Sequence, residues 1–505
     1  MHDLDASLLN FIIEASTNMP SDIRRVIARW REREDASTLS GRAVGIISKN
    51  IDMARNQRAP ICQDTGMLTF WVQAPRGTDQ RYLTAAIHEA VATATRMGAL
   101  RPNSVDSITG KNAGFNIGPG TPVIHYEQAE SDTIEIMLLL KGGGCENQNA
   151  QYSLPCELPE LGRADRDLDG VYKCLIHAVH QAQGHGCSAG FLGACIGSDR
   201  AEGYAEAKRQ LLRDAEDINP DPRLADLEQR VMEHADALGI GAMGFGGRVT
   251  LLGCKIGALN RIPASFFVSI AYNCWAYRRI GVRLDPASGA IAEWMFRDEA
   301  PANLGDDPSR LPERSVKRIT TPLDEATVRS LRVGDLALVT GVVHTGRDGL
   351  HKRLMTEAPP VPLTGGLIYH CGPVVIKDAD GQWLVRSAGP TTSIREEPYQ
   401  AEVLRRTGAR AVAGKGGMGA KTLAALQEVG GVYLNAIGGA AAYYASTVTG
   451  VEGVDLLEEL GVPEAMWHLR VVDFPAIVTM DAAGNSLHAE VLQRSRERLP
   501  ETLSS

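Results

Sequence analysis

The chain has 505 residues, of which 44% are hydrophobic and 22% are charged, and its formal net charge is −9. This length allows several domains whose cores bury most of their apolar surface. The negative balance repels nucleic-acid phosphate and disfavours nucleic acid as a partner. No apolar run approaches the roughly 20 residues of a membrane span, and the acidic first thirty residues lack a signal-peptide pattern. We therefore expect a cytoplasmic protein with no membrane role.

Apolar residues at helical spacing predict helices over 5–18 and 21–33, with Ser21 as a helix N-cap after Pro20. Further helices are predicted over 79–98, 203–216, 223–238 and 264–280, and a buried strand over 134–140. The first part of the chain is thus predicted to be α-rich around a buried sheet.

The segment 297–318 is polar, contains prolines and has no apolar period, which is typical of a connection between domains. We therefore predict an N-terminal domain over 1–296, a linker over 297–318 and a C-terminal domain over 319–505. Strand-like and helix-like segments alternate after the linker, at 335–343, 347–355, 366–370, 396–406, 409–413, 417–428 and 431–437. This alternation predicts an α/β domain with parallel strands, and the fold class as a whole is α/β with two domains.

The chain contains nine cysteines and no Cys-x-x-Cys pair. In the cytoplasm each is expected to be a small buried hydrophobe or a metal or redox ligand rather than half of a disulfide. A metal site must then be assembled from distant segments. In the string PICQDTG, Cys62 adjoins Gln63 and Asp64, which suits ligation combined with polar substrate contact, although a packed thiol is the alternative.

Several turns carry groups that suit an anion. Arg101 can clamp a carboxylate in two-pronged fashion or form a surface ion pair. The string GPTTSIR closes a strand and opens a helix, so its hydroxyls and Arg395 form either a carboxylate site or a simple helix cap. The run KGGG at 141–144 is either an anion-binding nest or a flexible turn. Arg347 and Lys415 add cations beside tight turns, and together these turns indicate a small polyanionic substrate.

A dinucleotide site is a weaker alternative. Gly239, Gly241 and Gly244 have the G-x-G-x-x-G register, but no strand is predicted before them and no acidic residue follows at about twenty positions. An NAD(P)-dependent dehydrogenase is therefore disfavoured.

Taken together, the motifs resemble the class I fumarases, the iron–sulfur hydro-lyases that include L-tartrate dehydratase and mesaconase. They occur in the family's order over nearly the whole chain: PICQDTG, KGGG, MGFGG, PASFFVSIAYNCWAYRR, RDGLHKR, GPTTSIR and AGKGGMG. The resemblance implies a [4Fe–4S] cluster held by three thiolates with one iron open to substrate. It also implies a cluster-carrying N-terminal domain, a swivelling C-terminal domain and a homodimer.

The ligands implied by the resemblance are Cys62, Cys187 and Cys274. Cys195 is the alternative to Cys187, but it lies in the apolar string FLGACIG and is expected to pack, whereas Cys187 lies in a glycine-rich turn. The other five cysteines are expected to be structural: Cys145, Cys156, Cys174, Cys254 and Cys371.

The resemblance also implies roles in catalysis. Asp64 and Thr391 are the candidate acid and base, with Lys415 polarising or orienting them. The groups expected to hold the two carboxylates are Gln63, Arg101, Gly143 or Gly144, Arg347, Thr392 and Arg395. Closure of the two domains would assemble this site.

One departure bears on the substrate. The family commonly has a histidine where this chain has Ile262, and an apolar side chain offers dry, methyl-sized contact. We therefore expect hydration of mesaconate to (S)-citramalate to compete with or exceed hydration of fumarate to (S)-malate. The alternatives are an L-tartrate dehydratase, which usually has two separate polypeptides, and a non-catalytic iron–sulfur sensor.

Overall fold

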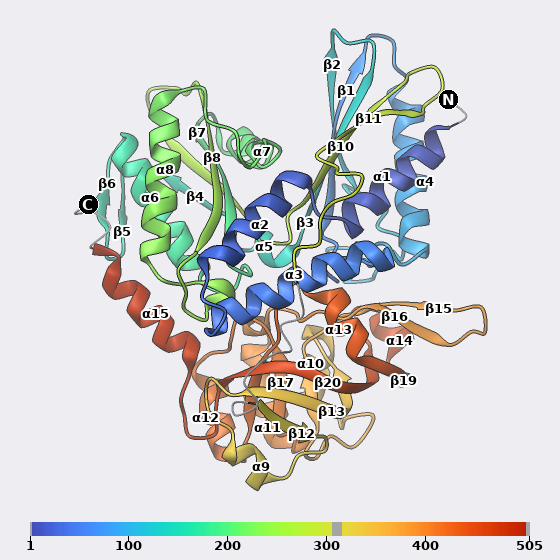
Figure 1. Cartoon of the computed structure of the whole chain (residues 1–505), viewed down its shortest axis with the longest axis vertical. Helices are drawn as coiled ribbons and strands as arrows, with labels where there is room; N and C mark the ends of the chain where they lie inside the picture. The colour runs from blue at the N-terminus through green and yellow to red at the C-terminus, as the bar shows by residue number, and fades with distance from the viewer. Residues whose placement is uncertain (1–2, 306–315, 501–505) are drawn as a thin grey trace. The chain divides into compact units, whose positions relative to one another are not determined.

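The computed structural model describes residues 3–305 and 316–500. The chain is a mixture of helices and strands, and its contacts divide it into two compact units (Figure 1). The first unit comprises Met1–Ser21, Ile46–Gly142 and Ala276–Asn485, and the second comprises Asp22–Gly45, Gly143–Trp275 and Ser486–Ser505. Each unit is therefore built from segments that are far apart in the sequence.

The first unit contains a five-stranded sheet in the order β11-β10-β3-β1-β2. Its strands are β1 (Met67–Pro75), β2 (Val123–Ala129), β3 (Ile134–Lys141), β10 (Arg278–Leu284) and β11 (Ile291–Met295). Helices α1 (Leu4–Thr17) and α4 (Gln80–Arg96) pack beside it, and alternate residues of β1 and β3 point into their shared core. Asp79 caps α4 by accepting hydrogen bonds from the backbone N–H groups of Arg81 and Tyr82.

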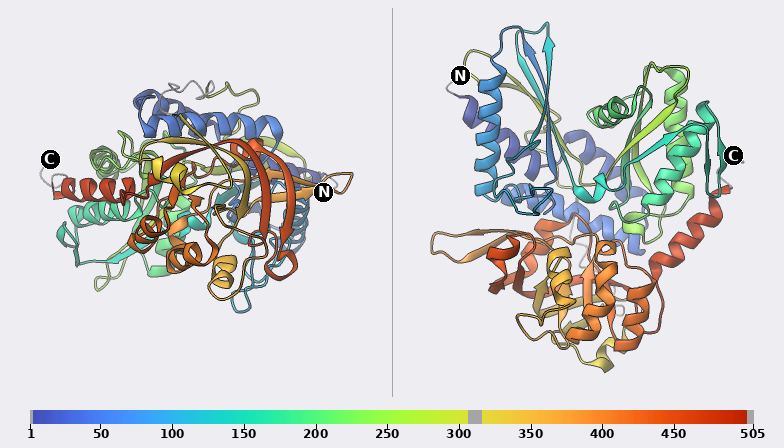
Figure 2. Two further views of the ribbon diagram at one scale, coloured as in Figure 1. Left: turned by 90° about the horizontal axis from the view of Figure 1, so that it is seen from below. Right: turned by 180° about the vertical axis from the view of Figure 1, so that it is seen from behind.

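A second sheet of this unit has seven strands in the order β12-β13-β14-β17-β18-β20-β19. The long strand β20 pairs with both β18 and β13. The strands are β12 (Val316–Thr320), β13 (Leu336–Thr345), β14 (Leu367–Tyr369), β17 (Ala411–Gly414), β18 (Val432–Asn435), β19 (Val448–Asp455) and β20 (Met466–Met480), and a hairpin is formed by β15 (Val374–Lys377) and β16 (Trp383–Ser387). The associated helices are α9 (Glu325–Ser330), α10 (Asp348–Leu354), η3 (Ser393–Glu396), α11 (Glu397–Thr407), α12 (Ala420–Val429), α13 (Ala441–Thr447) and α14 (Leu457–Leu460). Side chains of α10, α11 and α12 form one apolar core with the sheet. The ribbon of this part of the chain is coloured yellow to orange in Figure 2.

Parallel pairing explains how this sheet gathers functional groups. Strands β13, β14, β17 and β18 run parallel to one another, so their carboxyl ends meet at one edge. Arg347 follows β13 and Lys415 follows β17 at that edge. Because β20 pairs with β13 as well as with β18, these strands close on themselves, and the turns at this end present their side chains together.

The second unit contains a four-stranded sheet in the order β4-β9-β7-β8. Its strands are β4 (Ala150–Ser153), β7 (Gly190–Gly197), β8 (Leu251–Leu259) and β9 (Phe267–Asn273), with a hairpin of β5 (Cys156–Leu158) and β6 (Gly162–Ala164). Its helices are α2 (Ser21–Arg33), α5 (Gly143–Glu146), α6 (Leu168–Ala182), α7 (Arg200–Gln210), α8 (Pro222–Ala237), η1 (Ala242–Gly244) and α15 (Leu487–Arg498), and α3 (Leu39–Gln57) is divided between the units.

The α/β fold class is confirmed, and the strand predicted over 134–140 is present as β3. The helix predicted over 264–280 is wrong, because this segment forms β9 and the beginning of β10. Residues 306–315 of the predicted linker lie outside the described residues, so the boundary at 297–318 stays a prediction. None of the helices in the described ranges is both long and apolar enough to cross a membrane.

Candidate active site

The turn that carries Cys62 is held against the segment that carries Thr391. The carbonyl oxygen of Ile61 accepts hydrogen bonds from the Ala441 backbone N–H at 3.1 Å and from Asn50 Nδ2 at 3.0 Å. Gln63 Nε2 donates to the carbonyl oxygen of Pro390 at 2.8 Å. Cys62 is buried, with 5% of its surface exposed. These bonds bring two sequence motifs more than three hundred residues apart into one site.

Asp64 lies at the centre of this site. Arg101 Nη2 and Asn103 Nδ2 each donate to its Oδ1 at 3.3 Å. Arg278 Nη2 donates to its carbonyl oxygen at 2.8 Å. A side chain at Gly142 would meet its Oδ2, because a Cβ there would lie 3.2 Å away. A side chain at Gly142, directly after β3, would therefore press against the carboxylate.

Charge around Asp64 keeps its carboxyl group ionised. Burial alone would raise its pKa, but Arg101, Arg278, Lys415 and Arg347 together lower that pKa to about 2. Asp64 is thus a carboxylate at neutral pH.

The two predicted threonines lie beside Lys415, whose charge acts on Asp64. Thr391 and Lys415 are joined through the backbone, since the Lys415 N–H donates to the Thr391 carbonyl oxygen at 3.2 Å. Thr392 is the N-cap residue of η3 but makes no side-chain capping bond there. The interpretation of the Thr392 hydroxyl as a simple helix cap is therefore not supported.

Two arginines at this edge pair with acidic neighbours. Arg347 Nη1 lies 3.0 Å from Glu464 Oε1, and Arg395 pairs with Asp348. The charges of Arg347 and Asp64 both act on Arg395. The first unit therefore gathers four arginines and one lysine near Asp64, and two of these arginines are also paired with Glu464 and Asp348. This excess of cations suits an anionic substrate.

Sequence reasoning missed Asn103 and Arg278. Arg278 is 1% exposed, and its Nη1 atom is buried without a hydrogen-bond partner. Arg278 belongs to the motif NCWAYRR, which is otherwise largely apolar. A charged residue in that setting is the feature of the sequence that could have identified it. Asn103 follows Arg101 by two residues and is hydrogen-bonded to its Nε at 2.5 Å.

The second unit places Cys187 and Cys274 at one end of its sheet. Cys274 directly follows β9, and Cys187 precedes β7, whose Phe191 pairs with Asn273. Burial, and then the neighbouring thiols of Cys145, Cys274 and Cys187, raise the pKa of Tyr272 well above its usual value. Three thiols are therefore close enough to Tyr272 for their charges to act on it.

Cys195 lies elsewhere. It stands in the middle of β7 opposite Ser269, its pKa is raised to about 12 mainly by burial, and its thiol donates to the Ile196 carbonyl oxygen at 3.8 Å. This environment favours Cys187 over Cys195 as a ligand.

Ile262 is far from these thiols. It precedes β9, whereas Cys274 follows that seven-residue strand, so the two are separated by roughly 20 Å at about 3.3 Å per residue. Its side chain is 67% exposed. The predicted contact between Ile262 and a substrate methyl group therefore has no support in the structure.

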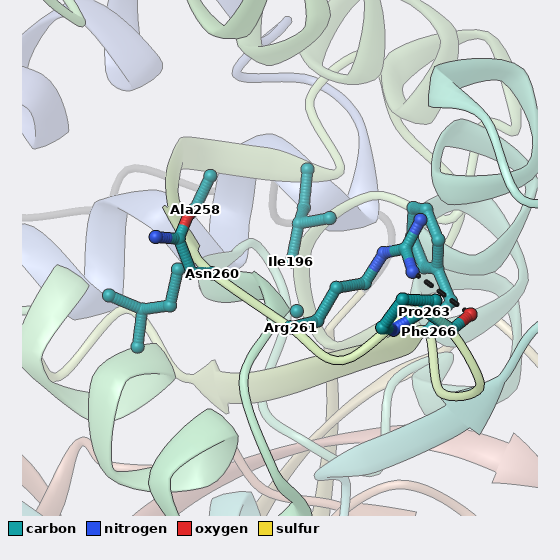
Figure 3. A pocket seen from close by; sticks show the side chains of 8 residues that line it. Ile196, Ala258, Asn260, Arg261, Pro263 and Phe266 are labelled. Atoms are coloured by element: carbon teal, nitrogen blue, oxygen red, sulfur yellow. Dashed lines mark hydrogen bonds between the residues drawn. The ribbon is translucent and has the colours of Figure 1, made fainter.

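A pocket near the Ile262 end of the sheet is lined by none of the predicted site residues (Figure 3). It is lined by Ile196, Gly197, Ala258, Leu259, Asn260, Arg261, Pro263 and Phe266.

Gly143 and Gly144 begin the short helix α5 of the same unit.

No group of three or more metal-binding side chains is gathered within residues 3–305 and 316–500. The predicted ligands belong to different units, with Cys62 in the first and the other two in the second. Cys187 and Cys274 are buried thiols, 3% and 7% exposed, at the same end of one sheet, and thiolates are the donor type that holds iron–sulfur clusters.

Comparison with known proteins identifies the family. A family model described as fumarate hydratase matches residues 6–283, and one described as the fumarase C-terminus matches residues 289–491. A Geobacillus stearothermophilus protein assigned to fumarate hydratase class I is 55% identical over 506 residues, covering 99% of this chain and 98% of that protein. The Escherichia coli L(+)-tartrate dehydratase subunit beta is 40% identical over 185 residues, which are 36% of this chain and 91% of that subunit. The chain therefore belongs to the class I fumarate hydratase family of hydro-lyases.

Proposed function

We propose that this chain reversibly hydrates fumarate to (S)-malate. The observation that supports this most directly is the ionised Asp64 carboxylate surrounded by Arg101, Arg278, Arg347 and Lys415. The cations balance a dianionic substrate, while the carboxylate takes or returns the proton at the carbon next to the one that is hydrated.

The proposed role of each residue follows from its chemistry. Arg101 and Arg347 hold substrate carboxylates as two-pronged donors, and Arg395 holds one at the turn before α11. Asp64 and Thr391 handle protons, and Lys415, which is 7% exposed beside Thr391, orients the hydroxyl. Gln63 and Thr392 add polar contacts, with Gly143 or Gly144 contributing backbone N–H groups.

Cys62, Cys187 and Cys274 are the proposed ligands of a [4Fe–4S] cluster. When bound, such a cluster supplies an iron that lacks a thiolate and acts as a Lewis acid toward substrate oxygen. The homodimer and the cytoplasmic location stay predictions, the first from the family resemblance and the second from the sequence.

The test is an assay of anaerobically purified protein with fumarate, mesaconate and L-tartrate, followed through alkene absorbance and, for tartrate, through product formation. We expect the largest kcat/KM with fumarate. Activity on L-tartrate alone would favour a tartrate dehydratase. Absence of turnover in iron-replete protein would favour a non-catalytic iron–sulfur protein.

The position of Ile262 gives a prediction about mesaconate. Because Ile262 lies at the far end of β9 from Cys274, Ile262→His is expected to change the ratio of kcat/KM for mesaconate to that for fumarate by less than about twofold. Steady-state kinetics with both substrates measure this ratio. A change of this ratio by tenfold or more in favour of fumarate would support contact between Ile262 and the methyl group of the substrate.

A further inference from the structure

Asn103 lies on the segment that carries Arg101, and its side-chain amide contacts both members of the Arg101–Asp64 pair. The amide oxygen accepts a hydrogen bond from Arg101 Nε at 2.5 Å. The amide nitrogen lies 3.3 Å from Asp64 Oδ1, 3.3 Å from the Gly66 carbonyl oxygen and 3.4 Å from Thr65 Oγ1. The two ends of one side chain therefore bridge the cation and the carboxylate of the site.

The chemistry of these neighbours fixes the direction in which the amide points. An arginine N–H can only donate, so the atom that faces Arg101 Nε is the amide oxygen. An ionised carboxylate and a backbone carbonyl can only accept, so the group that faces Asp64 and Gly66 is the NH2. A carboxylate at position 103 would set oxygen against oxygen, and an apolar side chain would serve neither neighbour. The site therefore favours an amide at this position.

The backbone of Asn103 is held in place by a second amide. The Asn103 N–H donates to Asn116 Oδ1 at 2.6 Å, and Asn116 Nδ2 donates to the Arg101 carbonyl oxygen at 2.8 Å. Pro102, between these two bonds, has a restricted φ. Asn116 itself is 3% exposed. None of these bonds uses the side chain of Asn103, so the segment keeps them when that side chain alone is replaced.

The same amide decides which donors of Arg101 remain for a ligand. A guanidinium has five N–H groups. Its Nε donates to Asn103, its Nη1 to the Gly372 carbonyl oxygen at 3.0 Å and its Nη2 to Asp64 Oδ1 at 3.3 Å. Among the described residues, these three bonds leave one N–H on each terminal nitrogen. A carboxylate can accept from both terminal nitrogens at once.

We propose that Asn103 is a positioning residue whose amide holds Arg101 and Asp64 in one fixed relation, the arginine for a substrate carboxylate and the aspartate for proton transfer. The inference deepens the proposed function and rests on it for the identity of the substrate. An amide supplies a donor toward Asp64 without adding charge. A carboxylate at position 103 would instead neutralise part of the charge of Arg101 and repel a dianion.

The first test asks whether Asn103 acts through Asp64. We expect Asn103→Ala to lower kcat for fumarate hydration by about tenfold or more, but by less than about twofold when Asp64→Asn is already present, because residues that act as a unit are not additive. Anaerobic steady-state kinetics of holoenzyme with equal iron content measure both ratios. A residue that only stabilises the fold would cause the same loss in both backgrounds.

The neighbouring residue provides the matched control. Ser104→Ala removes the hydrogen bond between Ser104 Oγ and Thr121 Oγ1 at 2.9 Å and keeps the bond from the Ser104 backbone N–H to Asn116 Oδ1 at 3.2 Å. It disturbs the same segment without touching Arg101 or Asp64. We expect kcat within about twofold of the unsubstituted value, the usual range for a substitution away from a site.

The second test uses succinate, a saturated dicarboxylate that cannot be hydrated, and measures its Kd by calorimetry with anaerobically prepared holoenzyme. Asn103→Asp nearly keeps the size of the side chain and the acceptor for Arg101 Nε, but it adds a charge. We expect it to raise Kd about tenfold more than Asn103→Ala does, because like charges brought together are costly. If position 103 only filled space, the aspartate variant would bind succinate better than the alanine variant.

Three results would each overturn the inference: a kcat of Asn103→Ala within twofold of the unsubstituted value, an equal loss in the Asp64→Asn background, or a Kd for Asn103→Asp no higher than that for Asn103→Ala. In each case hydration of fumarate by the unsubstituted protein leaves the proposed function standing. If fumarate is not hydrated but the expected order of Kd values is found, the proposed function fails and the role of Asn103 in anion binding stands.

Discussion

Asp64→Asn is expected to lower kcat for fumarate hydration by about 10²- to 10⁴-fold, the usual loss when a positioned acid or base is removed. Asparagine keeps the size of the side chain and an oxygen that can accept from Arg101 and Asn103. It cannot take up a proton. Anaerobic steady-state kinetics measure the effect, and Asp132→Asn, which changes an exposed carboxylate on the turn before β3, is the matched control.

The pH dependence of stability provides an independent measurement for the same variant. The pKa of Asp64 is depressed in the folded protein, so its contribution to the free energy of unfolding is complete above pH 3.8 and is lost as pH falls toward about 2. Asp64→Asn should lack this component of acid destabilisation. A variant that retains kcat within tenfold of the unsubstituted protein would exclude Asp64 as the proton-transfer group, whatever its stability.

The sequence predicted local elements well where their apolar spacing was unambiguous, as in α1, α4 and β3. It failed over 264–280, because Phe266, Phe267, Val268, Ile270 and Tyr272 form a dense apolar run that periodicity alone does not distinguish from a buried helix. Their aromatic and β-branched side chains favour a strand, and β9 is the result.

The interleaving of the two units could not be predicted from the order of elements along the chain. The five-stranded sheet joins β1, β2 and β3 to β10 and β11, which follow nearly 140 residues later, after the whole sheet of the second unit. Such pairing depends on long-range contacts that leave no mark in composition or local period. The two units therefore do not follow the order of segments along the chain.

Neighbouring residues with the same side chain show why the site was only partly predictable. Glu397 accepts hydrogen bonds from the Gly419 backbone N–H at 2.8 Å and from Thr422 Oγ1 at 2.6 Å, and so caps α12. Glu396, one position earlier, has no partner for either oxygen. Nothing in the string SIREEPYQ separates these two environments, because they depend on elements elsewhere in the chain.

Replacement of the proposed cluster ligands should have the largest effect on cofactor content. Cys187→Ser and Cys274→Ser are each expected to lose most of the bound iron and sulfide and to reduce hydration to background, because a serine hydroxyl is a poor substitute for a thiolate. Cys62→Ser should behave in the same way. Iron and sulfide analysis of anaerobically purified variants measures this, and Cys195→Ser, in the middle of β7, should retain both.

Cys145 makes this experiment decisive, because its thiol also lies beside Tyr272 and donates to the Gly186 carbonyl oxygen at 3.8 Å. If the ligands are Cys62, Cys187 and Cys274, Cys145→Ser retains its iron. If Cys145→Ser loses iron while Cys62→Ser keeps it, the three thiols of the second unit hold the cluster among themselves. Cys62 would then be a packed thiol beside Gln63, and the catalytic argument would rest on Asp64 and its cations alone.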